Sequence, residues 1–289
     1  MIKAYLKSAR KKENSLLALP KAAAGWHWLV NLIFPIQCLG CSLENAWMCL
    51  RCLETIPTAP HHKCAFCEAK TEFGKTCAHC LKRHHLDGAL SFIPYAQPLI
   101  QAMLHSWKYN GVSQITPYLT RLVLHGIQKS KNINRQRAAR FLDEAMPRQT
   151  LSRMPAMPPL LYNEHTLLAP IPLHKKKLKQ RGFNQAALLA KSISQYLNNA
   201  LYAPLLGRHK KTVAQAGLHG IDRVTNMWDA FSLTKNFDIK GRHIIIVDDV
   251  ITTGSTCDAA AKILKDAGAL SVWALTIAYG HAVIAPNKN

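Results

Sequence analysis

The chain has 289 residues, of which 48% are hydrophobic, and this excludes a wholly disordered polybasic chain because a buried core can form. Its 37 lysine and arginine residues against 16 acidic residues give a formal net charge of +21. Such a surplus favours an anionic partner and leaves open a nucleic acid, an anionic membrane surface or a phosphorylated small molecule.

Residues 1–27 form a basic N-terminal extension with some helical character, and the apolar stretch at 26–35 follows it. The apolar run inside the extension is broken by Pro20 and Lys21, which does not fit a signal peptide. The sequence contains no run of about 18 uncharged apolar residues, as a membrane-spanning helix would need. We therefore expect a cytoplasmic protein with no transmembrane segment, and its charge leaves peripheral contact with the inner face of the membrane open.

Eight of the nine cysteines lie in four Cys-x-x-Cys pairs. Two such pairs complete a tetrahedral four-sulfur shell, so the spacing predicts two structural zinc ions. A disulfide framework would need an export signal, and a redox Cys-x-x-Cys does not occur four times in succession. The predicted ligands are Cys38, Cys41, Cys49, Cys52, Cys64, Cys67, Cys77 and Cys80.

We favour sequential pairing within this module, the first pair with the second and the third with the fourth, while an interleaved cross-brace stays open. Histidines close to the cysteines are interpreted as solvated or phosphate-facing side chains and not as ligands. They are His61, His62, His79, His84 and His85. Cys257 stands apart and is interpreted as a small helix residue.

Beyond the cysteine-rich module, alternating strands and helices predict a parallel α/β sheet. We expect strands at 89–95, 166–171, 202–206, 243–248 and 271–278, and helices at 98–107, 116–128, 184–199, 222–229 and 256–267. Residues 129–164 are basic and proline-rich and predict an insertion, part helix and part linker. The expected domains are the extension at 1–27, a zinc module at 28–86 and an α/β domain at 87–282.

A lysine-rich run follows His174 and includes Lys175, Lys176 and Lys177. It has three interpretations: a solvated loop, the lip of an anion pocket, or a nucleic-acid contact. Aromatic residues such as Trp107 could stack on bases beside these charges, although aromatics at such spacing are more often part of a core.

The strongest chemical signal is the sequence HIIIVDDVITTGST at 243–256. Residues 244–247 predict a buried parallel strand, and Asp248 and Asp249 stand at its carboxyl end, where ligands bind in open α/β sheets. A strand, a polar loop and a capped helix without a ligand is the alternative, but paired aspartates ending a buried strand are costly unless something uses them.

The loop after these aspartates predicts a phosphate site. Its backbone N–H groups and hydroxyls, at a helix N-terminus, suit a phosphate monoester, and the paired carboxylates suit a vicinal diol or a magnesium ion. The loop residues are Thr252, Thr253, Gly254, Ser255 and Thr256.

VDDVITTGST resembles the phosphoribosyl pyrophosphate (PRPP) signature of type I phosphoribosyltransferases. The four cysteine pairs, followed by WKYNG at 107–111, APIPLH at 169–174 and RGFNQ at 181–185, resemble the competence protein F family of double zinc ribbon proteins. The resemblance covers about 28–125 and 165–280, and the motifs occur in the family's order. It implies a type I phosphoribosyltransferase fold behind a double zinc ribbon.

The resemblance also implies residue roles. Asp248 and Asp249 would contact the ribose hydroxyls, the loop at 252–256 would hold the 5′-phosphate, and magnesium would arrive with the pyrophosphate of PRPP. The implied pyrophosphate loop is Pro170, Ile171, Pro172, Leu173 and His174. Lys211, Thr212, Gln215 and Arg223 resemble a mobile loop that closes over the pyrophosphate, and Arg181, Asn184 and Gln185 belong to the family signature.

Two functions are then open. In the first, the protein binds PRPP with magnesium and takes part in DNA uptake and natural transformation, handling incoming single-stranded DNA in the cytoplasm beside the DNA-uptake machinery. In the alternative, it is a metabolic phosphoribosyltransferase with an unidentified acceptor and no nucleic-acid role. Phosphoribosyl transfer depends on charge stabilisation and water exclusion, so the lack of a recognisable nucleophile does not exclude an enzyme.

Overall fold

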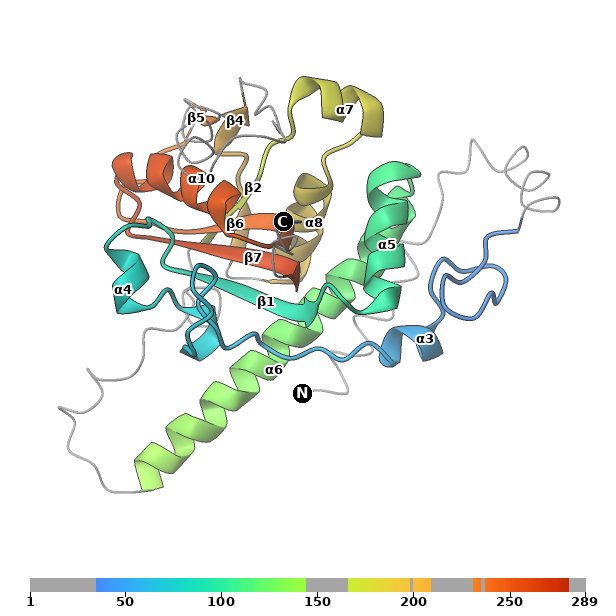
Figure 1. Cartoon of the computed structure of the whole chain (residues 1–289), viewed down its shortest axis with the longest axis horizontal. Coiled ribbons are helices and arrows are strands. Elements are labelled where there is room, and N and C mark those ends of the chain that lie inside the picture. Colours follow the sequence, from blue (N-terminus) through green and yellow to red (C-terminus); the bar gives the residue numbers. More distant parts are fainter. Residues whose placement is uncertain (1–34, 144–165, 198–199, 209–230, 235–236, 281–289) are drawn as a thin grey trace, which may run out of the picture. The chain divides into compact units, whose positions relative to one another are not determined.

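The computed structural model describes residues 35–143, 166–197, 200–208, 231–234 and 237–280 (Figure 1). It divides into two compact units, Met1–Thr55 and Ile56–Asn289, which are considered separately. The predicted extension at 1–27, the predicted helix at 222–229 and residues 144–165 of the insertion region lie outside the described residues.

The described part of the first unit is a small cysteine-rich fold. Gln37 and Glu44 form an antiparallel bridge, and the short helix α3 (Leu50–Glu54) follows. The side chain of Cys49 caps this helix by accepting a hydrogen bond from the Cys52 N–H group. The tight turn and the capped helix each carry one of the two cysteine pairs.

The second unit is built on a parallel sheet, as the sequence predicts. Among the described residues its strand order is β1-β7-β6-β2-β3, and every neighbouring pair is parallel. The strands are β1 (Gly88–Pro94), β7 (Ser271–Tyr279), β6 (His243–Ile251), β2 (Thr166–Pro170) and β3 (Ala200–Tyr202). Their near-continuous apolar runs fit a sheet that is covered on both faces.

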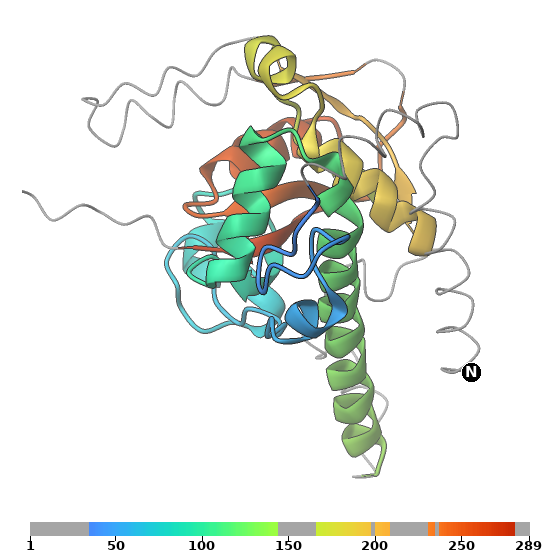
Figure 2. The same cartoon turned by 90° about the vertical axis from the view of Figure 1, so that its right-hand side faces the viewer.

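Helices cover the two faces of this sheet, as Figures 1 and 2 show. On one face, α10 (Ser255–Asp266) packs its buried alanines against residues such as Ala169 and Ile246. On the other, α6 (Thr116–Asp143) and α8 (Gln185–Tyr196) contact the strands, and Gly126 of α6 lies against the ring of Phe92. A Cβ at Gly126 would fall 2.3 Å from that ring, so glycine permits this close approach.

Smaller elements complete the described part of this unit. The strands β4 (Leu206–Arg208) and β5 (Phe231–Leu233) form a separate antiparallel pair. Two 3₁₀ turns are η2 (Glu72–Gly74) and η3 (Ser113–Ile115). The remaining helices are α4 (Ala78–Leu81), α5 (Pro98–Tyr109) and α7 (Lys175–Arg181).

The segment that carries the second cysteine cluster, Cys64, Cys67, Cys77 and Cys80, is bonded to the edge strand of the sheet. The His61 N–H group donates to the carbonyl oxygen of Ser91 in β1 at 2.8 Å. Lys75 forms an antiparallel bridge with Gly88, the first residue of β1. Residues 56–87 therefore extend the sheet with backbone hydrogen bonds, and the structural division falls after Thr55.

One open interpretation is decided and two element predictions need correction. The lysine-rich run, for which a solvated loop was one of three interpretations, is the helix α7, because His174 caps its start and Gly182, at φ 77°, ends it. The helix predicted at 116–128 continues to Asp143, into the predicted insertion. The strand predicted near 202–206 is divided between β3 and β4. Within the described residues, no helix is both long and apolar enough to cross a membrane.

Candidate functional site

The cysteines gather in two groups of four within the described part of the chain. Each group is sequential, the first from residues 38–52 and the second from residues 64–80, with all ligand atoms of a group within 4.8 Å of one another. The sulfur atoms of Cys41 and Cys49 lie 3.6 Å apart, and those of Cys67 and Cys77 lie 3.5 Å apart. A tetrahedral zinc site with Zn–S bonds of about 2.3 Å has sulfur–sulfur edges of about 3.8 Å. Each group can therefore hold a metal ion such as zinc.

Backbone N–H groups favour the thiolate form of one cysteine in each group, Cys38 and Cys77, whereas the neighbouring thiols, first that of Cys49, raise the pKa of Cys52 to about 12. The Cys49 N–H group points at the sulfur of Cys38 at 3.2 Å. Burial raises the pKa of Cys38, but the backbone N–H groups of Cys49 and Gly40 outweigh it and bring the pKa down to about 6. In the second group, the Cys80 N–H group lowers the pKa of Cys77 to about 7. Thiolates are the form that binds metal, so the donor set fits zinc.

Two histidines near the second group, His61 and His84, have structural contacts, which corrects the expectation of solvated or phosphate-facing side chains for these two, whereas His79 is exposed as expected. The ring of His84 stacks on Phe66 at 3.7 Å, and its Nδ1 lies 2.9 Å from a carboxylate oxygen of Asp258 in α10. His61 stacks on Tyr279 at 3.7 Å between centroids. These histidines therefore connect the cysteine cluster to the sheet.

Two of the segments predicted to hold the ligand lie together at one edge of the sheet. β2 and β6 are adjacent and parallel, with Pro170 opposite Val247. The Ile171 N–H group extends this pairing by donating to the Val247 carbonyl at 2.9 Å. Since the carboxyl ends of parallel strands meet at one edge, the loop at 170–174 and residues 248–256 are neighbours.

The two aspartates are held by their own backbone. Asp248 accepts a hydrogen bond from the Asp249 N–H group at 2.8 Å, and Asp249 accepts one from Val250 at 2.7 Å. Successive residues of a strand point to opposite faces, so Asp248 lies on the side of α10 and Asp249 on the side of α6 and α8. β6 continues past both to Ile251, further than the sequence predicts.

The electrostatic environments of the aspartates differ. Burial of its carboxyl group, and then the negative charge of Asp249, raises the pKa of Asp248 to about 7. Asp249 has a close counterion, because Lys108 Nζ lies 2.5 Å from its Oδ2 atom. Lys108 belongs to the WKYNG motif and comes from the last turn of α5. Lys108 was not among the residues predicted for the site, although the WKYNG motif that contains it was an available signal.

The phosphate-loop candidate ends at the N-terminus of α10. Gly254 has φ 73° and caps the helix, and the hydroxyls of Thr253 and Ser255 lie 2.8 Å apart. Backbone N–H groups at such a helix N-terminus suit an anion. Cys257, in the first turn of α10, is buried, and burial raises its pKa well above the usual range, so it remains a core thiol and not a nucleophile.

The second cysteine cluster contacts this loop directly. A Cβ on Gly254 would lie 2.9 Å from the ring of Phe66, which stands between Cys64 and Cys67. Asp258 of α10 accepts hydrogen bonds from the backbone N–H groups of His85 and Leu86 at 2.7 and 3.1 Å. The N-terminus of α10 is therefore fixed by residues that flank the cysteines.

The family motifs meet at the same edge. The Gln185 side chain donates to the backbone carbonyl of Trp107 at 3.2 Å, and Arg181 donates to Gln185 at 3.2 Å. Asn184 donates to the carbonyl of Ile171 at 3.0 Å, in the pyrophosphate-loop candidate. These bonds join WKYNG, RGFNQ and the loop at 170–174 into one structure.

The aromatic residues of these motifs divide between core and surface. Trp107 is fully buried and donates its indole N–H to Thr116 at 3.0 Å, so it is a core residue. Tyr109 is exposed, and the guanidinium of Arg181 lies 5.5 Å from its ring centroid. The mobile-loop candidates Lys211, Thr212, Gln215 and Arg223 lie outside the described residues.

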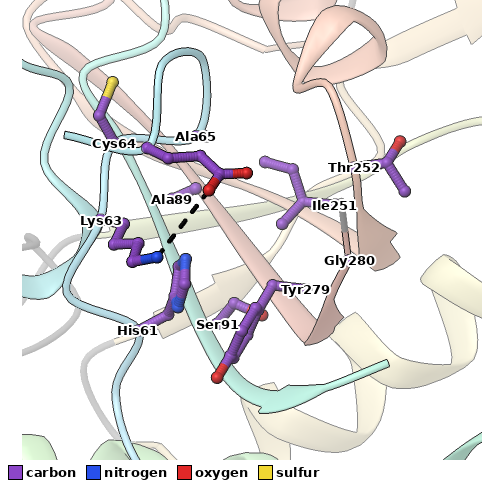
Figure 3. Close-up of a pocket in the computed structure, with 11 residues that line it drawn as sticks. His61, Lys63, Cys64, Ala65, Ala89, Ser91, Ile251, Thr252, Tyr279 and Gly280 are labelled. Atoms are coloured by element: carbon purple, nitrogen blue, oxygen red, sulfur yellow. Dashed lines mark ion pairs between the residues drawn. The ribbon is translucent and has the colours of Figure 1, made fainter. Parts of the chain in front are cut away.

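A hollow opens beside the loop, between the second cysteine cluster and the ends of β6 and β7 (Figure 3). Thr252 lines it from the phosphate-loop side, and Ser91 and Tyr279 line it from β1 and β7. At its rim, Lys63 and Glu68 form an ion pair at 3.8 Å. Its lining is partly polar and partly apolar, and among the candidates for phosphate binding Thr252 reaches it.

Comparison with known proteins agrees with this geometry. The phosphoribosyl transferase domain family matches residues 184–288, which include the loop at 252–256. Competence protein F of Haemophilus influenzae is 28% identical over 252 residues, which cover 84% of this chain and 97% of that protein. The chain is a relative of competence protein F. This confirms the resemblance, and the fold is that of a phosphoribosyltransferase with cysteine clusters ahead of it.

Other relatives match less of their length or are similarly distant. The DNA utilization protein YhgH of Escherichia coli is 27% identical over 248 residues, covering 79% of this chain and 95% of that protein. Competence protein ComFC of Bacillus subtilis is 35% identical over 116 residues, 40% of this chain and 45% of that protein. A solved Trypanosoma cruzi hypoxanthine phosphoribosyl transferase is 13% identical over 50% of this chain and 60% of that one, with a TM-score of 0.25, so the fold assignment rests on the strand order and the family match.

Proposed function

We propose that this protein binds PRPP with magnesium and acts in DNA uptake and natural transformation, where it handles incoming single-stranded DNA in the cytoplasm. The observation that supports ligand binding is the edge formed by Asp248, Asp249 and the loop at 252–256. The support for a DNA role is that its relatives are named for competence and for DNA utilization.

Different residues of the chain would bind different parts of PRPP. The hydroxyls and N–H groups at the start of α10 would hold the 5′-phosphate, and the two aspartates would accept hydrogen bonds from the ribose hydroxyls. The loop at 170–174 and Arg181 would face the pyrophosphate. Magnesium, which prefers oxygen ligands and keeps several waters, would arrive on the pyrophosphate and offset part of its charge.

The eight cysteines would hold two zinc ions in this proposal. Four thiolates leave no open coordination position, so the metal would support the fold and not the chemistry. The second ion would act on the site indirectly, since the residues around its ligands contact Gly254 and Asp258.

Calorimetric titration with PRPP and magnesium chloride tests the ligand. We expect binding by the wild-type protein and none by the double variant Asp248→Asn, Asp249→Asn, because each substitution removes the negative charge and replaces one acceptor oxygen by a donating NH2 group. Asp238→Asn, with Asp238 exposed and outside this edge, is the matched control and should bind as the wild type does. Equal affinity in the double variant would contradict the proposal.

The double variant also tests the biological role. Introduced into a competent bacterium in place of the wild-type gene, it should lower transformation frequency while protein levels stay unchanged. If the double variant no longer binds PRPP and the bacterium still transforms normally, the role in DNA uptake does not depend on PRPP binding.

The hollow in Figure 3 favours the metabolic transferase as the second candidate. It lies beside Thr252, and its volume of about 20 Å³ would admit only the reacting end of an acceptor. If the protein is a metabolic transferase, it should release pyrophosphate from PRPP only when a small-molecule extract of cells supplies the acceptor. Filling the hollow by Ala65→Trp should then stop release without weakening PRPP binding, and unchanged release in that variant would exclude the hollow as the acceptor site.

A further inference from the structure

Lys108 and Asp249 form an ion pair at the centre of the proposed PRPP site. The Nζ–Oδ2 distance is 2.5 Å, and the side chains keep only 20% and 16% of their exposed surface. Asp249 stands next to Asp248, and two carboxylates in a partly desolvated edge repel each other. Lys108 is therefore the close counterion of Asp249 at this edge.

The ion pair occupies a carboxylate that the ligand needs. A ribose diol that donates to Asp249 would compete with the ammonium group for the same oxygen atoms. The backbone at Lys108 is held in place, because the carbonyl of the preceding Trp107 accepts a hydrogen bond from Gln185 and the Trp107 ring is buried. The four-carbon side chain of Lys108 has rotatable bonds, so its ammonium group can move while the backbone stays in place.

Other cations surround this pair. Burial, followed by the positive charges of Arg181, Arg208 and Lys108, lowers the pKa of Lys177 in α7. These four cations come from three elements, α5, α7 and β4, whereas the carboxylates that oppose them are Asp248 and Asp249. The excess of positive charge can be balanced by an anion that carries several charges.

We infer that Lys108 is a mobile counterion, which pairs with Asp249 before ligand binding and transfers to the pyrophosphate group when the ribose diol takes its place. The inference rests on the proposed function. It assigns to Lys108 a contact with the substrate that the resemblance did not assign, and it links occupation of the diol site to recognition of the leaving group.

Two ligands separate this exchange from a fixed ion pair. Ribose 5-phosphate has the diol and the 5′-phosphate but no pyrophosphate, and PRPP has all three. Lys108→Met should weaken binding of PRPP with magnesium by about 10- to 100-fold, the effect of one charge-assisted hydrogen bond. Binding of ribose 5-phosphate should not weaken, because this ligand has no pyrophosphate for Lys108 to contact and the variant removes a competitor for Asp249.

Lys108→Arg keeps the charge and should retain most of the PRPP affinity. Lys191→Met, at an exposed position of α8, makes the same chemical change away from the site and should leave both affinities unchanged. Calorimetry supplies the affinities, and thermal unfolding of each variant shows whether it is folded. If Lys108→Met does not fold, Lys108→Gln replaces it in the same comparison.

The outcomes are distinct. Failure of the wild-type protein to bind PRPP would overturn the proposed function itself. If folded Lys108→Met binds PRPP as tightly as the wild type does, the inference is overturned and the proposed function still stands. An equal loss for both ligands would also overturn it, because that is the result of a fixed ion pair that only positions Asp249.

Discussion

Gly254 joins the phosphate-loop candidate to the second cysteine cluster. Its φ of 73° lies in the left-handed region, and the ring of Phe66 occupies the space where a Cβ would be. A side chain here would therefore cost twice, once in backbone strain and once in displacement of an aromatic ring that also stacks on His84.

Gly254→Ala should lower stability by more than Gly241→Ala does. Gly241 has φ 70° and no atom within 4 Å of its Cβ position, so its variant carries the backbone strain alone, about 1–2 kcal/mol. Gly254→Ala adds overpacking against Phe66 and should cost about 1–3 kcal/mol more. Urea unfolding of the two variants gives the difference directly. Equal losses would show that Phe66 yields freely and does not hold the loop.

At the scale of elements, α7 is the clearest departure from expectation. It has no buried residues, so no apolar periodicity marked it as a helix. Lysine, leucine, glutamine and arginine are good helix formers, and the caps at His174 and Gly182 close the two ends. The helix therefore presents its lysines as a compact basic element next to the pyrophosphate-loop candidate.

Replacement of Lys175, Lys176 and Lys177 by Ala tests whether α7 contacts single-stranded DNA. The affinity for a labelled oligonucleotide, measured by fluorescence anisotropy, should fall with rising salt, and the variant should reduce the log–log slope by up to about 2, since each neutralised phosphate contributes about 0.7. The triple variant Lys70→Ala, Lys191→Ala, Lys240→Ala removes the same charge from exposed positions in other segments. If both variants change the slope equally, net charge and not α7 determines binding.

At the scale of the whole molecule, the two cysteine clusters belong to different units. The first lies within Met1–Thr55, whereas the second lies in the unit that contains the sheet. Hydrogen bonds such as that from His61 to Ser91 join the second cluster to β1. Loss of the metal from each cluster should therefore affect the sheet unit differently.

Cys41→Ser and Cys67→Ser are matched variants, because each removes an exposed second cysteine of a pair. Elemental analysis should give two zinc ions per wild-type chain, and we expect each variant to lose one. Cys67→Ser should lower the unfolding midpoint of the sheet unit and weaken PRPP binding, since Phe66 and Asp258 lose their support. Cys41→Ser should leave both unchanged. Fewer than two zinc ions in the wild type would contradict the zinc assignment, and equal effects would contradict the division.

The sequence alone determined the features that local patterns encode. Two residues between cysteines indicate ligands of one ion, so the eight ligand cysteines followed from spacing, whereas the structure decided that they group sequentially. The apolar run at 244–247 specified a buried strand. Because the two aspartates come directly after it, their place at the carboxyl end of that strand followed from the sequence. The exact ends of elements did not follow, because strand pairing extends β6 to Ile251 and caps outside the apolar pattern define α7.

Only the tertiary structure decided which distant residues meet. His84 and Asp258 are 174 positions apart and pair because residues 56–87 extend the edge of the sheet beside α10. Lys108 reaches Asp249 because the last turn of α5 lies close to the carboxyl end of β6. A sequence lists charges and ligands by position along the chain, whereas their distances in space depend on strand order and packing, and these distances determine the chemistry of the site.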